Sequence, residues 1–159
     1  MTKGFTLIEL LIVMIIISIV AGIAVITVST SQRKQYETLA NQLVNSIVLA
    51  EQEAMLRPAT LGLAFTPHSF QFYMMEKNKW VAIDKSPLKR HTLPANIQIT
   101  LKINNEIVET NGSLKIIITP SNDLTPFIIL IGKHDENPYY QVKGQANGEV
   151  TSAAILQTE

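Results

Sequence analysis

Residues 5–28 read FTLIELLIVMIIISIVAGIAVITV, and this stretch decides the architecture of the first third of the chain. From Leu10 to Val28 the apolar run is interrupted only by Ser18, Thr27 and small alanine or glycine positions. Such a run approaches the roughly 20 apolar residues that an α-helix needs to cross a bilayer. We therefore expect a transmembrane part at about residues 8–28.

The helical pattern continues beyond this run. Apolar residues recur every three or four positions, as one helix face requires; they are Tyr36, Leu39, Ala40, Leu43, Val44, Ile47, Ala50 and Ala54. No proline lies between Phe5 and Arg57, and Pro58 biases Arg57 away from the α region. The pattern predicts a helix over residues 5–57, about 80 Å long at 1.5 Å per residue. Its second half should pack on the chain's own C-terminal domain.

Residues 58–159 contain most of the helix-breaking residues, since all seven prolines and five of the seven glycines lie there. Short apolar segments between turn signals predict an antiparallel β domain, and an α+β fold overall. Ile97 to Ile103 alternates as a half-buried strand does, whereas Ile116–Ile118 and Phe127–Ile131 should be buried on both faces. The predicted strands are Leu61–Phe65, Phe70–Met75, Trp80–Ile83, Ile97–Ile103, Leu114–Ile118, Phe127–Ile131 and Tyr139–Val142.

Charge and composition exclude several classes of function. The net charge is zero, and residues 58–159 hold nine Lys or Arg against nine Asp or Glu, so no electrostatic footprint for nucleic acid follows. The absence of cysteine excludes disulfides and thiolate metal sites. His68, His91 and His134 accompany no nucleophile motif or metal-ligand spacing and are expected on the surface or in loops. We expect no enzyme activity, cofactor or metal.

Glu9 is the chemical anomaly of the apolar run. A carboxylate within a membrane helix costs about 2.5 to 3.5 kcal/mol and usually has a functional partner. No Lys, Arg or His lies between Glu9 and Arg33, so an intermolecular partner is favoured. Thr6 and Glu9 also fit a capping box, in which the carboxylate stabilises the helix start. The two roles are compatible.

A secretory signal peptide is the alternative interpretation of this region, since Gly22 and Ala24 are spaced for cleavage after Ala24. Two features oppose it. The apolar run continues through Ile26 and Val28 past that cut, and Glu9 lies where a basic region should pass into apolar sequence.

The nine residues Lys3–Leu11, KGFTLIELL, resemble the class III signal of type IV pilins and type II secretion pseudopilins. The resemblance implies that a prepilin peptidase cuts between Gly4 and Phe5 and so removes the leader, residues 1–4. It also implies that Phe5 is N-methylated. Glu9 would become the fifth residue of the mature chain. In the family, that glutamate is thought to pair with the N-terminal amine of a neighbouring subunit during assembly. The implied fold is pilin-like.

The C-terminal domain is similar to the H-type minor pseudopilins of type II secretion, although Thr119 and Asn122-Asp123 depart from the usual pattern. The resemblance implies other pseudopilins as partners, both major and minor tip subunits, together with prepilin peptidase, the inner-membrane assembly platform and membrane lipid. It also implies a single inner-membrane span with the domain in the periplasm. A minor type IV pilin acting in DNA uptake is the alternative. The resemblance rests on Phe70-Gln71-Phe72-Tyr73, Trp80, Leu93-Pro94, Thr119-Pro120, Thr125-Pro126-Phe127 and Gly148-Glu149-Val150.

One group of acidic and amide residues could suggest calcium, which takes several oxygen ligands. The spacing matches no known ligand loop, and turn chemistry explains Asn and Asp at such positions. We therefore expect turns here; the group is Asn122, Asp123, Asp135, Glu136 and Asn137.

The single basic cluster contains Lys85, Lys89, Arg90 and His91. A small DNA-binding surface is one interpretation. Because the domain is neutral, a solvated loop is favoured, and nucleic acid is not an expected partner.

Overall fold

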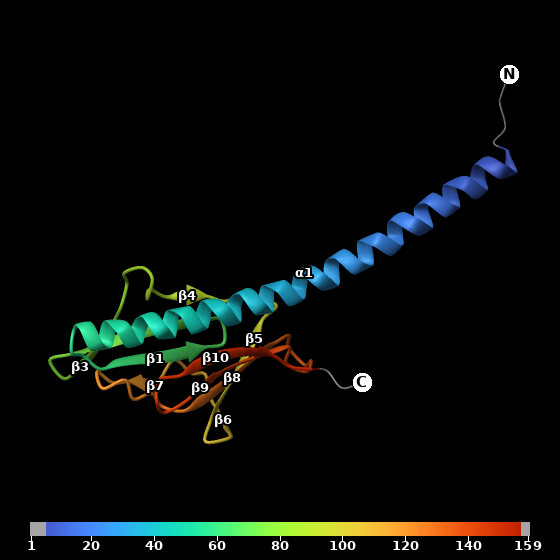
Figure 1. Ribbon diagram of the computed structural model, residues 1–159. Coiled ribbons are helices and arrows are strands. Elements are labelled where there is room, and N and C mark those ends of the chain that lie inside the picture. The colour runs from blue at the N-terminus through green and yellow to red at the C-terminus, as the bar shows by residue number, and fades with distance from the viewer. Residues whose placement is uncertain (1–5, 157–159) are drawn as a thin grey trace. The chain divides into compact units, whose positions relative to one another are not determined.

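The computed structural model describes residues 6–156, apart from the side chains of residues 21–32. It divides into two units, Met1–Gln35 and Tyr36–Glu159, and the division falls within one long helix, α1 (Leu7–Leu56). Ten strands follow in the described residues (Figure 1). They are β1 (Leu61–Thr66), β2 (Ser69–Glu76), β3 (Lys79–Ala82), β4 (His91–Thr92), β5 (Gln98–Ile103), β6 (Glu106–Val108), β7 (Leu114–Ile118), β8 (Phe127–Gly132), β9 (Tyr140–Gly144) and β10 (Val150–Ala154).

Local chemistry accounts for both ends of α1. The Thr6 hydroxyl accepts the Glu9 backbone N–H at 3.4 Å, as a residue that caps a helix N-terminus does. At the other end the Arg57 N–H still donates to the Glu53 carbonyl at 3.0 Å, and Pro58 follows. The predicted long helix is therefore present, and its predicted start at Phe5 lies outside the described residues.

The strands form two antiparallel sheets within the unit Tyr36–Glu159. One sheet has the order β3-β2-β1-β7, with β4 also paired to β2, and the other has the order β10-β9-β8-β5-β6. Figure 1 shows the second half of α1 lying along β1. The predicted α+β fold with an antiparallel β domain is thus confirmed.

One hydrophobic core joins α1 to both sheets. The predicted helix stripe faces it, since Leu43, Ile47 and Ala50 are fully buried, and Val44 is half-buried at its margin. Inward-facing residues of the two sheets complete this core; they include Leu61, Leu63, Phe70, Phe72, Ile99, Leu101, Ile116, Ile129 and Ile131. The unit therefore folds by burying one face of each sheet and one face of the helix.

The prediction that β7 and β8 are buried on both faces is wrong. Ile117, Ile128 and Leu130 are only half-buried, while their neighbours along each strand are buried. One face of each strand meets the core, and the other is partly in contact with solvent. A continuous apolar run does not by itself distinguish these two environments.

Three strands lie outside the sequence prediction, and each is short or weakly β-forming. β6 follows a two-residue turn at Asn104-Asn105, where both φ angles are positive (52° and 68°), as this type of hairpin turn requires. β4 has two residues, and β10 contains serine and alanine, which have little β-propensity. Pairing with β9 in register, from Val150 opposite Gly144 to Ala154 opposite Tyr140, defines β10.

Candidate assembly surface

From Leu7 to Val20, the first part of α1 whose side chains the structure describes, apolar side chains are exposed on all sides of the helix. From Leu10 to Ile17, eight consecutive residues are each at least 45% exposed, and eight residues complete more than two helical turns. Ser18, the polar interruption, donates to the Met14 carbonyl at 2.8 Å and so presents no unsatisfied hydroxyl. A helix that is apolar all round is suited to an apolar environment or to packing among other helices.

Among the described side chains, no helical stretch is both long enough and apolar enough to cross a membrane. The predicted span at about residues 8–28 includes residues 21–28, whose side chains lie outside the described part.

Glu9 lies in the first turn of α1 and is exposed. One of the two hydrogen bonds of the predicted capping box is present, because the Thr6 hydroxyl accepts the Glu9 N–H. Next to the positive end of the helix dipole, the carboxylate is favourably placed. Gly4 and Phe5, the predicted processing residues, lie outside the described residues.

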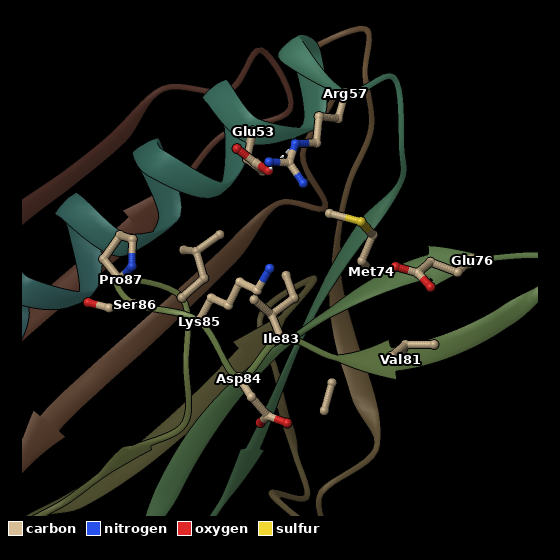
Figure 2. A pocket seen from close by; sticks show the side chains of 12 residues that line it. Glu53, Arg57, Met74, Glu76, Val81, Ile83, Asp84, Lys85, Ser86 and Pro87 are labelled. Atoms are coloured by element: carbon tan, nitrogen blue, oxygen red, sulfur yellow. Dashed lines mark ion pairs between the residues drawn. The ribbon is translucent and has the colours of Figure 1, made fainter.

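A hollow of about 350 Å³ lies where α1 ends, between the helix, β2, β3 and the β3–β4 loop. Figure 2 shows Glu53, in the last turn of α1, paired with Arg57, which directly follows the helix; their side chains approach to 3.0 Å. Half of the residues that line the hollow are apolar, and in addition to this pair Glu76 and Asp84 contribute acidic side chains and Lys85 a basic one. The apolar lining consists of Met74, Val81, Ala82, Ile83, Pro87 and Leu88.

His91 holds the β3–β4 loop against α1. The Pro87 carbonyl can only accept, so the His91 Nε2–H donates to it at 2.9 Å, and Nδ1 accepts from the Gln42 amide at 3.0 Å. The ring also stacks on Phe70, with centroids 4.8 Å apart. His91 is therefore a half-buried strand residue, and its predicted loop position is wrong. His68 and His134 are exposed, as predicted.

The basic cluster includes one residue with a structural role. Arg90 donates through two guanidinium nitrogens, at 3.2 and 3.1 Å, to the hydroxyl of Ser69, which is 2% exposed. Lys85 lines the hollow at the end of α1. Arg90 therefore helps to hold the chain before β4 against β2.

The acidic and amide residues considered for calcium make turn contacts. Asn122 has a φ of 65°, and its amide donates to the Asn147 carbonyl at 3.1 Å. Glu136 accepts from Lys133 at 2.6 Å and from the Tyr139 hydroxyl at 3.0 Å, and these bonds hold the pKa of Glu136 below its ordinary value. Within the described residues, no group of three or more His, Asp or Glu side chains is placed to hold a metal ion.

Glu51 is a buried carboxylate that the sequence analysis did not single out. It is 5% exposed, its Oε1 has no hydrogen-bond partner in the described structure, and desolvation raises its pKa to about 7. Its spacing is the signal that could have found it. Glu51 lies four residues after Ile47 and three before Ala54, which places all three on one helix face.

The first 25 residues match the family model described as the prokaryotic N-terminal methylation motif. Over 141 residues the chain is 28% identical to type II secretion system protein H of Pseudomonas aeruginosa, a match that covers 79% of this chain and 80% of that protein. It is 22% identical to the protein of the same name from Aeromonas hydrophila, with coverage of 99% and 94%.

Solved structures of similar fold are also minor pseudopilins of type II secretion. The minor pseudopilin EpsH from the type II secretion system of Vibrio cholerae superposes with a TM-score of 0.70 at 16% identity, over 80% of this chain and 99% of that one. The chain has a pilin-like fold. The solution structure of GspH from E. coli shares this pilin-like fold, with a TM-score of 0.64 at 14% identity, over 77% and 90% of the two chains. The predicted resemblance to the H-type minor pseudopilins is confirmed.

Proposed function

We propose that this chain is a minor pseudopilin of a type II secretion pseudopilus, which assembles through α1 and helps to export folded proteins across the outer membrane. The observation that carries the proposal is the described first part of α1, Leu7 to Val20, in which apolar side chains are exposed on all sides and Glu9 is the single carboxylate. The H-type relatives align with most of this chain and belong to type II secretion. A type IV pilus role in DNA uptake is therefore not favoured.

The first proposed step is proteolytic processing of the N-terminus. Prepilin peptidase cuts between Gly4 and Phe5, and Phe5 is N-methylated. The match to the methylation motif spans both residues and supports this step. Residues at about 8–28 then cross the inner membrane once, with the β domain, residues 58–159, in the periplasm. The proposed role is mechanical, without catalysis, cofactor or nucleic acid.

Charge pairing would favour assembly. A carboxylate in an apolar helix is costly while it is unpaired, and no cation lies between Glu9 and Arg33. Cleavage creates a positively charged amine, and a neighbouring subunit's amine can neutralise Glu9. The proposed partners are other pseudopilins, major and minor, with prepilin peptidase, the inner-membrane assembly platform and lipid acting during insertion and assembly.

The intact mass of the membrane-extracted chain tests the processing step. We expect a mass that lacks Met1–Gly4 and carries one added methyl group. Retention of the leader, or a cut after Ala24, would contradict it. The pairing step is tested with Glu9→Gln, which should leave cleavage intact yet reduce incorporation into the pseudopilus. Glu37→Gln, a matched change at an exposed position of the same helix, should incorporate normally.

A further inference from the structure

One row of residues crosses the sheet β10-β9-β8-β5-β6 on the face turned away from the core. Its neighbours along the three central strands, Leu101, Ile129 and Val142, are fully buried. Successive side chains of a strand point to opposite faces, so the row faces solvent. From β10 to β6 the row is Thr151, Lys143, Ile128, Lys102 and Ile107.

Two lysines in this row flank the same residue. Lys102 on β5 and Lys143 on β9 are the register partners of Ile128 on the strand between them. Neighbouring strands lie about 4.8 Å apart, so the Cα atoms of the two lysines are separated by roughly 10 Å. The flexible four-carbon stem of lysine lets both ammonium groups reach the space above Ile128.

Neither lysine is neutralised by a neighbour. Lys102 and Lys143 form no ion pair with any residue between 6 and 156 whose side chain the structure describes. Two positive charges at this separation repel each other, and the repulsion is relieved when an anion lies between them. The sequence concealed this pair, because the two lysines are 41 positions apart and only the strand registers bring them together.

A hollow of about 320 Å³ opens beside the two lysines, where β5 ends and β8 begins. No acidic side chain lines it, so the two lysines give its lining a charge of +2. Asn104 and Asn105, in the β5–β6 turn, are exposed, and their amides can donate hydrogen bonds. The lining consists of Lys102, Asn104, Asn105, Pro126, Phe127, Ile128, Lys143 and Gly144.

We propose that this hollow, the Lys102–Lys143 site, binds a phosphate monoester. Such a group carries about −1.5 to −2 charges at pH 7 and three strong acceptor oxygens. Two ammonium groups balance that charge, and the asparagine amides supply further donors. A carboxylate or a phosphate diester carries one negative charge and would leave one lysine unpaired. The volume of the hollow is that of a site for a small ligand. Phosphate binding here is a function in addition to assembly through α1.

Acetylation of the full-length, detergent-solubilised chain tests the proposal. A lysine held by phosphate reacts slowly, because only a free amine attacks the reagent. Inorganic phosphate and glycerol 3-phosphate should each slow the modification of Lys102 and Lys143, measured at each residue by mass spectrometry. Lys79, exposed on β3 of the other sheet, should react at an unchanged rate. Acetate at the same ionic strength should protect neither lysine of the site. Equal slowing at Lys79 would mean that salt screening alone is responsible and would overturn the site.

A shared ligand couples the two lysines, whereas independent surface charges would respond separately. Lys102→Gln should raise the concentration of glycerol 3-phosphate that half-protects Lys143 at least about tenfold, since a charge-assisted contact is lost. Lys143→Gln should have the same effect on Lys102. Lys79→Gln is the matched control and should change neither value. Protease resistance of the β domain checks that the variants fold. Unchanged protection of Lys143 in Lys102→Gln overturns the proposal.

Vesicle flotation separates two sources of the phosphate group, a soluble phosphate monoester and a lipid headgroup. The full-length chain in phosphatidylcholine nanodiscs is mixed with vesicles of phosphatidylcholine and phosphatidic acid. Flotation of the chain with the vesicles, lost in Lys102→Gln, identifies a lipid headgroup as the ligand. Protection by glycerol 3-phosphate without flotation identifies a soluble phosphate monoester. If neither lysine is protected, the site is overturned whatever the vesicles do.

Discussion

Tyr36 and Tyr139 stack with their ring centroids 5.1 Å apart and their planes 2° from parallel. Tyr36 is 2% exposed and begins the unit that contains both sheets, so this contact fixes the helix to the β domain at the point where the unit starts. The Tyr139 hydroxyl also donates to Glu136, which pairs with Lys133. A small polar network therefore supports the stack.

Tyr36→Ala is expected to lower the free energy of unfolding by about 3 to 5 kcal/mol, because it removes a large buried ring and leaves a cavity. Tyr36→Phe keeps the ring and should change it by less than about 1.5 kcal/mol. Urea unfolding of the detergent-solubilised chain, followed by the fluorescence of Trp80, measures both; Trp80 is the only tryptophan. Equal losses in the two variants would show that the ring stack is not the stabilising contact.

Replacing Glu51 should change the pH dependence of stability. Its pKa is about 7 in the folded chain against an ordinary value of 4.5, so the folded state binds more protons between these values. The free energy of unfolding should therefore fall by roughly 3 kcal/mol as the pH rises from about 4.5 to 7. It should stay at the lower value above pH 7. Glu51→Gln should remove this component and stabilise the chain at pH 8.

Urea unfolding at pH 5 and pH 8 checks the Glu51 prediction. Glu37→Gln is the matched control, because Glu37 is exposed on the same helix. If Glu51→Gln keeps the wild-type difference between the two pH values, burial of the Glu51 carboxylate is not its source.

His91→Phe should loosen the β3–β4 loop while the domain stays folded. The substitution retains a ring against Phe70 but removes the hydrogen bonds to Gln42 and Pro87. We expect the free energy of unfolding to fall by about 1 to 2 kcal/mol. Trypsin should also cleave faster after Lys89. His134→Phe, at an exposed histidine, should leave the cleavage rate unchanged. Unchanged cleavage in His91→Phe would mean that other contacts hold the loop.

Gly62→Ala should be destabilising although it adds one methyl group. A Cβ at this position would lie 2.7 Å from Leu114 Cδ2 and 3.1 Å from the Trp80 ring. Overpacking of this kind costs about 1 to 3 kcal/mol. Adding Leu114→Ala should recover part of the loss, and a double-mutant cycle measures the coupling. Additive losses would indicate that Leu114 is not the obstructing side chain.

Local patterns were sufficient for α1 and for seven of the ten described strands, and for their inward faces. The three-to-four-residue spacing around Leu43 and Ile47 predicted the buried helix face, and the alternation at Ile99 and Leu101 predicted a half-buried strand, because each periodicity is a property of the backbone itself. The same reasoning failed for Ile117 and Ile128, since an apolar run does not say whether a second layer covers it. The predicted cut between Gly4 and Phe5 stays a prediction from the motif.

The sequence by itself determined a long helix that is apolar all round in its first half and one-sided in its second, a β domain after Pro58, and the N-terminal signature around Glu9. Only the tertiary structure decided which distant residues meet. Gln42 and His91 are 49 positions apart, and their contact depends on β4 pairing with β2 in register. Burial of Glu51 likewise depends on what the sheets place over its helix face. Periodicity encodes which side of an element is apolar, whereas sheet register and helix packing choose what that side touches.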